Sequence, residues 1–125
     1  MTFKTTVIVG AGQSGLAMSR ELSRLGIEHL ILERGTVANA WRKDRWDSLK
    51  LLTPNWANGL PGSPYWGGDP HGYMPISTLI SQLDGYAKRI GAPVQTDTDV
   101  SKVRRSESGY VIETNQGPIA HLKAP

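Results

Sequence analysis

Residues 6–33 read TVIVGAGQSGLAMSRELSRLGIEHLILE, and this stretch decides the fold. A short apolar run, residues 7–9, leads directly into the pattern Gly10-x-Gly12-x-x-Gly15. A helical pattern follows, and then a second apolar run that ends on an acidic residue. This order predicts a strand, a phosphate-binding turn, a helix and a parallel strand, which together form the βαβ unit that holds a dinucleotide.

Each glycine of the pattern has a physical task. Gly10 lets the chain turn tightly out of the strand, and Gly12 lets the backbone approach a pyrophosphate without a Cβ in the way. Gly15 lets the helix pack closely on the sheet. The amides of Gln13 and Ser14 then face the phosphates from the helix N-terminus, where the helix dipole also favours an anion.

Glu33 directly follows the second apolar run, residues 29–32. Its carboxylate can accept hydrogen bonds from both hydroxyls of an adenosine ribose and would repel a 2′-phosphate, which disfavours NADP at this site. Ser19 is a small residue expected to face the sheet, and Gly26 is expected to end the helix as a left-handed C-cap. This context favours a dinucleotide site over an accidental glycine-rich turn, although Glu33 alone leaves FAD and NAD as alternatives.

Composition narrows the class of protein. With 125 residues the chain forms one domain at most, and it is short for a complete dinucleotide-dependent enzyme. Its formal net charge of +3 comes from dispersed Lys and Arg, which does not indicate a nucleic-acid-binding surface. The sequence contains no cysteine, and His29, His71 and His121 share no metal-ligand spacing, so neither a redox dithiol nor a metal site is predicted. The N-terminus enters a strand without a leader, and no apolar run approaches a membrane span, which predicts a cytoplasmic protein without membrane contact.

The periodicity of apolar residues predicts the other elements. The first helix, residues 13–25, places Met18, Leu22 and Leu25 on its apolar face. Apolar residues recur at intervals of three and four over residues 76–90, which predicts a second amphipathic helix. Strands are expected at residues 94–96, 100–105, 110–114 and 119–122, of which the last three form a β-meander.

Residues 34–75 break this periodicity and hold all four tryptophans. Aromatic side chains are costly to expose, so we expect an ordered excursion with a helical turn near residues 37–42. Three of the tryptophans are expected to be packing residues rather than substrate contacts, namely Trp46, Trp56 and Trp66.

Several segments carry a more specific signal than the glycines. They are Glu33-Arg34, Ala40-Trp41-Arg42, WDSLKLLTP at residues 46–54 and Leu60-Pro61-Gly62. Together with the glycine pattern they resemble the N-terminal FAD-binding region of the flavin-containing monooxygenase-like family, nearest to its bacterial FAD/NAD(P)-dependent flavoprotein oxidoreductases. The resemblance covers nearly the whole chain. It implies an α/β fold, a Rossmann-like three-layer FAD-binding domain with a parallel sheet and a β-meander.

The resemblance also implies which residues would bind FAD. The residues that would hold the pyrophosphate are Gly10, Gly12, Gln13, Ser14 and Gly15. Those near the adenosine are Glu33 at the ribose, Arg34 beside the adenine and the backbone of Val100 at the adenine edge. Those toward the flavin are Trp41 and Arg42 along the ribityl chain and pyrophosphate, and Leu52 and Thr53 near the isoalloxazine. Arginine suits phosphate and an indole can cover a ribityl chain, but a core position for Trp41 and a solvated one for Arg42 are the alternatives.

The reaction of this family implies that no catalytic dyad is needed. NADPH delivers hydride to the flavin, oxygen adds to the reduced flavin, and the protein positions and shields the cofactor while a small-molecule substrate is oxidised. We therefore predict no catalytic residue, and Asp47 is interpreted as the cap of a turn rather than a base. The substrate itself is not indicated by any residue.

Two family elements are not found in these 125 residues. A strand ending in Ala-Thr-Gly would follow the meander, and a second glycine fingerprint would hold NADPH. We therefore expect residues 1–125 to form an FAD-binding domain that is incomplete at the C-terminus, with no NADPH-binding domain. The strand at residues 6–9 would be left as an apolar sheet edge that favours self-association or a partner chain.

Two classes of function follow from these predictions. The first is the FAD-binding part of an NAD(P)H-dependent flavoprotein monooxygenase or oxidoreductase, which as this chain alone should show little or no turnover. The second is a non-catalytic or partner-completed dinucleotide-binding fragment. An NAD-binding domain of an ordinary dehydrogenase is a weaker third interpretation, because the meander and the segments at residues 41–42 and 51–54 are unusual there.

Overall fold

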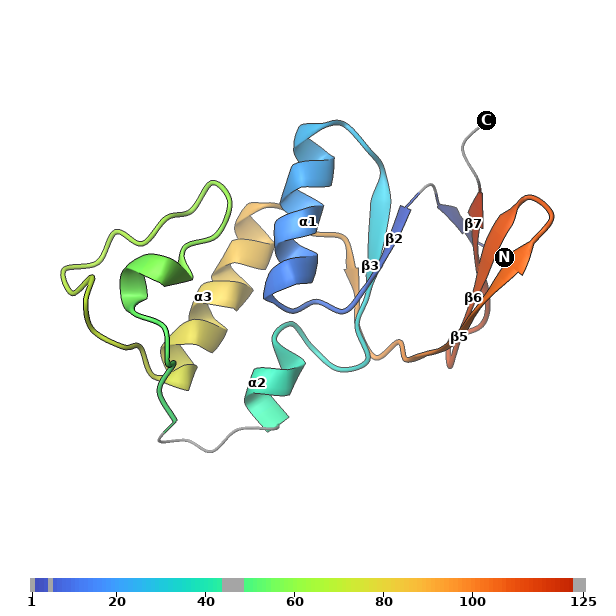
Figure 1. Ribbon diagram of the computed structural model, residues 1–125. Coiled ribbons are helices and arrows are strands. Elements are labelled where there is room, and N and C mark those ends of the chain that lie inside the picture. Colours follow the sequence, from blue (N-terminus) through green and yellow to red (C-terminus); the bar gives the residue numbers. More distant parts are fainter. Residues whose placement is uncertain (1, 5, 44–48, 123–125) are drawn as a thin grey trace.

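The computed structural model describes residues 2–4, 6–43 and 49–122 (Figure 1). Trp46 and Asp47 lie outside the described residues, so the predictions made for them are not tested. The strands are β1 (Thr2–Lys4), β2 (Thr6–Val9), β3 (His29–Leu32), β4 (Val94–Gln95), β5 (Val100–Ser106), β6 (Gly109–Thr114) and β7 (Ile119–Leu122). The helices are α1 (Gln13–Arg24), α2 (Asn39–Lys43), α3 (Ile76–Arg89) and a 3-10 turn at Asn55–Asn58. None of the helices in the described ranges has the length and apolar composition of a membrane span.

Two sheets and a helical layer are stacked on one another. The first sheet is parallel, in the order β2-β3-β4, and the second has the order β1-β7-β6-β5 with the predicted antiparallel meander in it. Helices α1 and α3 lie on one side of the parallel sheet and the meander lies on the other (Figure 1). The three-layer α/β fold with a parallel sheet and a β-meander is therefore confirmed. Strand β1, which pairs in parallel with β7, was not predicted.

Successive side chains of the parallel strands point to opposite faces and so fill two separate cores. Ile8 and Ile31 pack with the buried side chains of α1 and α3 in the helix-side core. Leu30 and Leu32 pack with Ile112 in the meander-side core. A parallel sheet that is covered on both faces buries the side chains on each face. The sequences of β2 and β3 are therefore apolar almost throughout.

The prediction for the buried face of α1 was wrong. Met18 and Leu25 are exposed, whereas Leu16 and Ser19 are fully buried. Positions 12, 15, 16 and 19 share one face of the helix, and the close contact of Gly15 with the turn below it sets this face against the sheet. The prediction that Ser19 faces the sheet is confirmed. The prediction that Gly26 ends the helix is also confirmed by its φ of +71°.

A buried hydrogen bond joins α1 to the start of β3. The hydroxyl of Ser19 lies 2.7 Å from His29 Nε2, and Nδ1 of the same ring lies 2.9 Å from the carbonyl oxygen of Ile27. A carbonyl can only accept, so Nδ1 carries a proton and donates to Ile27. This histidine is a structural residue, and within the described ranges no three potential ligands group together as a metal site.

The tryptophan-rich segment does not form an apolar layer. Trp56 is 62% exposed and Trp66 is 87% exposed, so the prediction that they pack was wrong. The segment is anchored in the helix-side core by other side chains, Leu60 and Met74, and is held further by polar contacts. The amide of Asn55 donates to the carbonyl oxygen of Asp69 at 2.8 Å, and the amide of Gln82 in α3 donates to the carbonyl oxygen of Asn58 at 3.0 Å. Such contacts fix the backbone without covering the rings.

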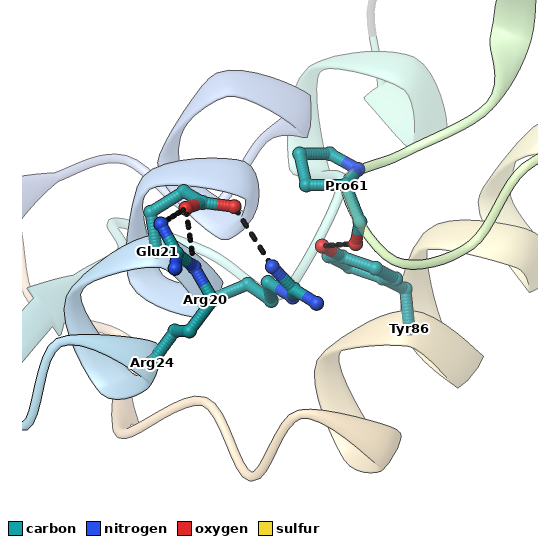
Figure 2. A network of polar contacts seen from close by, with 5 residues as sticks. All are labelled: Arg20, Glu21, Arg24, Pro61 and Tyr86. Atoms are coloured by element: carbon teal, nitrogen blue, oxygen red, sulfur yellow. Dashed lines mark hydrogen bonds and ion pairs between the residues drawn. The ribbon is translucent and has the colours of Figure 1, made fainter.

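The turn at residues 60–63 is fastened to α3, and Figure 2 also shows a group of ion pairs within α1. The hydroxyl of Tyr86 in α3 donates to the carbonyl oxygen of Pro61 at 2.6 Å. Glu21 in α1 lies between two arginines and accepts from Arg20 and Arg24, each at 3.0 Å. These two hydrogen bonds hold the pKa of the Glu21 carboxyl below its ordinary value.

Replacing Tyr86 by phenylalanine should weaken the fold in a pH-dependent way. At neutral pH the variant loses one hydrogen bond to Pro61, which we expect to lower the free energy of unfolding by about 1 kcal/mol. Burial raises the pKa of the Tyr86 hydroxyl above its ordinary value. The contribution of the neutral phenol is therefore complete below the unfolded-state pKa and is lost as the pH rises through the folded-state pKa.

Urea unfolding at pH 7 measures the loss of the hydrogen bond, and urea unfolding at pH values above about 10 measures how this loss depends on pH. The difference in stability between the wild type and Tyr86→Phe should shrink as the pH rises. An unchanged difference across this range would show that the Tyr86 hydroxyl is not buried in the fold.

Candidate functional site

A cavity of about 440 Å³ opens at the carboxyl ends of β2 and β3. This edge of a parallel sheet is where open α/β folds bind their ligands. The lining residues come from four chain segments: Val9, Gly10 and Gly12; Leu32, Glu33 and Arg34; Ala38, Asn39, Ala40 and Trp41; Thr98, Asp99 and Val100.

The glycine turn forms the floor of this cavity, with Gly10 and Gly12 in its lining. Gly10 has a φ of +102°, and its N–H donates to the carbonyl oxygen of Leu32 at 2.7 Å, which joins the turn to β3. A Cβ on Gly15 would overlap the carbonyl oxygen of Gly10, so α1 sits directly on the turn. A Cβ on Gly12 would meet no atom within 4 Å, which leaves open space above the backbone at that point.

Helix α1 presents backbone amides at this floor. Gly12 is its N-cap and no side chain caps it. The first amides of a helix, here those of Gln13 and Ser14, have no partner within the helix and carry the positive end of its dipole. The turn and helix together offer uncapped N–H donors beside the open space at Gly12, which is the chemistry that a pyrophosphate requires.

Glu33 has a role in the turn that the sequence did not indicate. It is buried, and its two carboxylate oxygens accept from the N–H of Ala11 at 3.0 Å and from the N–H of Gly35 at 2.6 Å. The carboxylate thus fixes the glycine turn to the end of β3. Each carboxylate oxygen keeps a further lone pair. Glu33 can therefore make these two hydrogen bonds and still accept from a ribose, as predicted.

The start of α2 closes another wall of the cavity. Ala38 is buried and has a φ of +61°, which is uncommon for a residue other than glycine. Its N–H donates to the carbonyl oxygen of Ala11 at 3.1 Å, and its own carbonyl accepts from the N–H of Trp41 at 3.1 Å. Left-handed backbone at such residues is concentrated at functional sites. Here it turns the chain so that Asn39 and Trp41 reach the cavity.

The loop before β5 forms the opposite wall. The N–H of Thr98 donates to the carbonyl oxygen of Glu33 at 2.8 Å, and the N–H of Asp97 donates to that of Gly35 at 3.1 Å. These bonds bring Asp99 and Val100 beside the end of β3. The cavity is therefore enclosed by segments that are far apart in the sequence but meet at one end of the parallel sheet.

The structure brings together six of the predicted site residues at the cavity. They are Gly10, Gly12, Glu33, Arg34, Trp41 and Val100. Three more predicted residues, Gln13, Ser14 and Gly15, form the first turn of α1 beside it. Trp41 lines the cavity and also packs partly against the helix-side core, while its predicted contact with the flavin stays a prediction.

The other three predicted site residues lie away from the cavity lining. The guanidinium of Arg42 pairs with Asp84 in α3, and its Nε donates to the carbonyl oxygen of Val37 at 3.1 Å. Leu52 is 93% exposed, and the hydroxyl of Thr53 donates to Asn58 Oδ1 at 2.6 Å. The predicted contacts of these residues with the flavin or its phosphates stay predictions.

A second hollow, a groove of about 310 Å³, runs along the open edge of β2. Among the described strands, β2 pairs only with β3, so the edge expected from the sequence is present. Val9 is 61% exposed at this edge. The walls of the groove are mostly apolar and come from both sheets: Thr6, Val7, Val9, Val103, Tyr110 and Ile112.

Comparison with known sequences places the chain among flavoprotein oxidoreductases. Residues 7–123 match the family model described as pyridine nucleotide-disulphide oxidoreductase. The chain is 33% identical over 112 residues to an uncharacterized CzcO-like oxidoreductase of Geobacillus kaustophilus, covering 89% of this chain and 32% of the relative. It is also 33% identical over 114 residues to a probable indole-3-pyruvate monooxygenase, YUCCA4, of Arabidopsis thaliana, covering 89% of this chain and 28% of the relative.

Solved structures agree with this placement. A flavin-containing monooxygenase from Stenotrophomonas maltophilia superimposes with a TM-score of 0.82 at 26% identity, covering 95% of this chain and 36% of that one. A bacillithiol disulfide reductase from Staphylococcus aureus shares the fold, with a TM-score of 0.85 at 18% identity over 95% of this chain and 36% of that one. The chain thus spans about a third of the length of these relatives. The chain belongs to the pyridine nucleotide-disulphide oxidoreductase family, and its predicted resemblance to the flavin-containing monooxygenase-like branch is confirmed.

Proposed function

We propose that this chain is the FAD-binding part of an NAD(P)H-dependent flavoprotein monooxygenase or oxidoreductase. The observation that carries the proposal is the convergence of the glycine turn, Glu33 and the loop at residues 97–100 on one cavity. The relatives named above as monooxygenases support the same function.

The residues fit the adenosine diphosphate half of FAD. The pyrophosphate would lie over Gly12 and the amides of Gln13 and Ser14, where no Cβ intrudes. The ribose would reach the free lone pairs of Glu33, and the adenine would lie between Arg34 and Val100. Because a 2′-phosphate would meet the buried Glu33 carboxylate, NADP is disfavoured here.

The residues of this chain bind and orient the cofactor in this proposal. Bound FAD would supply the redox chemistry of such enzymes, with NADPH as co-substrate, while the protein positions it and excludes water. We assign no catalytic side chain. The sequence carries one glycine fingerprint, so NADPH would dock elsewhere in a longer protein, and we expect no sustained NADPH oxidation by residues 1–125 alone. The small-molecule substrate would also be bound in the complete enzyme.

Titration of the 125-residue chain with FAD tests the proposal. Binding should shift the visible flavin bands and raise the melting temperature, since a ligand at 100 times its dissociation constant adds about 2.7 kcal/mol of stability. Riboflavin is the matched control ligand, because it has the flavin ring but lacks the pyrophosphate and adenosine, and it should stabilise the protein much less. Stabilisation by NAD but not by FAD would indicate a dehydrogenase domain instead, and indifference to both would refute a dinucleotide site.

A second candidate function is a dinucleotide-binding module completed by another polypeptide, and the groove beside β2 favours it. We propose that a further strand pairs with the open edge of β2, contributed by a second copy or by a partner chain. An apolar edge strand with free backbone groups is a template for such pairing. The apolar wall formed by Val103, Tyr110 and Ile112 would cover the added strand.

Replacing Val103 by lysine should reduce this association. Val103 is half-exposed on the groove wall, and a buried ammonium there would be costly. Sedimentation equilibrium should show the wild type associating with rising concentration and Val103→Lys remaining monomeric. Trp66→Lys, which changes an exposed apolar residue outside the groove, is the matched control and should associate like the wild type. A wild type that is monomeric and sharply folded at every concentration would contradict self-association.

A further inference from the structure

The cavity wall at residues 97–99 begins with a left-handed residue and is held by hydrogen bonds on two sides. Asp97 has a φ of +52°, a conformation that side-chain-bearing residues adopt only at a cost in free energy. Thr98 and Asp99 line the cavity directly after it, and Val100 follows at the start of β5. A shift in this backbone would therefore move the wall against which the adenosine is expected to lie.

One side of this loop is held by the end of β3. The bonds from Asp97 and Thr98 to the carbonyl oxygens of Gly35 and Glu33 fix the loop toward the parallel sheet. These bonds use the amides of Asp97 and Thr98. The carbonyl of Asp97 and both backbone groups of Asp99 bond to a different element.

Asn115, in the turn between β6 and β7, meets all three of these groups. Its side-chain Oδ1 accepts from the N–H of Asp99 at 2.7 Å, and its Nδ2 donates to the carbonyl oxygen of Asp97 at 3.1 Å. Its own backbone N–H donates to the carbonyl oxygen of Asp99 at 3.2 Å. Gln116 adds one more donor, from its Nε2 to the carbonyl oxygen of Asp97 at 3.1 Å.

The turn that carries Asn115 is itself well defined. The hydroxyl of Thr114 donates to the carbonyl oxygen of Gly117 at 2.6 Å and accepts from the N–H of Gln116 at 3.0 Å. Gly117 has a φ of +101°, which closes the turn. The turn therefore holds Asn115 in a fixed position. The distance from the N–H of Asp99 to Asn115 Oδ1 is close to the short end of the usual range for N–H···O hydrogen bonds.

We propose that Asn115 is a positioning residue that sets the backbone of residues 97–99 against the cavity and thereby the affinity for the adenosine half of a dinucleotide. The inference rests on the proposed function. A carboxamide is needed because it offers an acceptor to Asp99 and a donor to Asp97 at once. An aspartate would keep the first contact and set an oxygen against the carbonyl of Asp97.

The test measures the dissociation constants of ADP and FAD by calorimetry at 10 °C, after circular dichroism has been used to check that each variant is folded. Both Asn115→Leu and Asn115→Asp should weaken binding of each ligand roughly 5- to 30-fold, the effect of one or two lost hydrogen bonds. Arg104→Met is the matched control, since it breaks the exposed Arg104–Glu113 pair on the same meander. It should bind within about twofold of the wild type.

The outcomes separate the inference from the function on which it rests. A purely structural role for Asn115 would lower the melting temperature of the free protein but leave both dissociation constants of the folded variants unchanged, which would overturn the inference alone. A wild type that binds neither ADP nor FAD would overturn the proposed function and this inference together. If Asn115→Leu does not fold, Asn115→Asp decides, because it keeps the volume of the side chain and the acceptor for Asp99.

Discussion

Replacing Gly15 by alanine should destabilise the protein by about 3 kcal/mol and abolish measurable FAD binding. The added Cβ would overlap the carbonyl oxygen of Gly10, and it would also lie 3.3 Å from Ile8 Cγ2. Neither neighbour can move freely, because Gly10 belongs to the turn and Ile8 to the helix-side core. The helix would have to rise off the turn, which would displace the amides of Gln13 and Ser14.

The matched control for this variant is Gly85→Ala in α3. A Cβ at Gly85 would meet only the end of the Arg89 side chain, at 3.8 Å. Because alanine favours a helix interior over glycine, this variant should be more stable than the wild type by about 0.5–1 kcal/mol. Urea unfolding and an FAD titration of both variants make the comparison. Equal effects of the two substitutions would contradict the close packing of α1 on the glycine turn.

Replacing Glu33 by glutamine should cost about 1–3 kcal/mol of stability and weaken FAD binding at least tenfold. The carboxylate accepts from Ala11 on one oxygen and from Gly35 on the other. A carboxamide has one oxygen, so one of these two amides would face an NH₂ group and stay unpaired. The glycine turn would lose its tie to β3, and the ribose would lose an acceptor.

Glu107→Gln is the matched control for this second variant. Glu107 lies exposed in the turn between β5 and β6, and the same loss of charge there should leave stability and FAD affinity unchanged. Thermal unfolding without ligand and an FAD titration separate the two roles of Glu33. A Glu33→Gln variant with the stability and affinity of the wild type would show that its carboxylate supports neither the turn nor the ligand.

The βαβ unit could be predicted because its signals are local. The bounds of β3 and the start of α1 follow from apolar runs and from the glycine pattern, and both were predicted correctly. The buried face of α1 could not be found from its apolar residues. It is set by the close approach of Gly15, and Met18 and Leu25 are left exposed as a result. Strand β1 depends wholly on pairing with β7, 117 residues further along the chain, which no local pattern reveals.

Only part of the cavity could be predicted, because only some of its residues carry a local sequence signal. The glycine turn and Glu33 follow directly from the fingerprint, whereas Arg34, Trp41 and Val100 rested on the family resemblance. All of these except Gln13, Ser14 and Gly15 line the cavity. Ala38 was missed because an alanine gives no sign that its φ is positive. The hydrogen bonds of Glu33 to the amides of Ala11 and Gly35 also depend on tertiary geometry, because Ala11 precedes β3 in the sequence and Gly35 follows it.

The proposed cofactor site is tested most directly by mapping where FAD binds, following the backbone amide chemical shifts of the 125-residue chain as FAD is added. If FAD binds in the cavity, the largest shifts should fall at residues 10–15, 33–34 and 98–100, with small shifts in the groove residues Val103 and Tyr110. Large shifts confined to the groove or to the tryptophan-rich segment, or no shifts at saturating FAD, would contradict it.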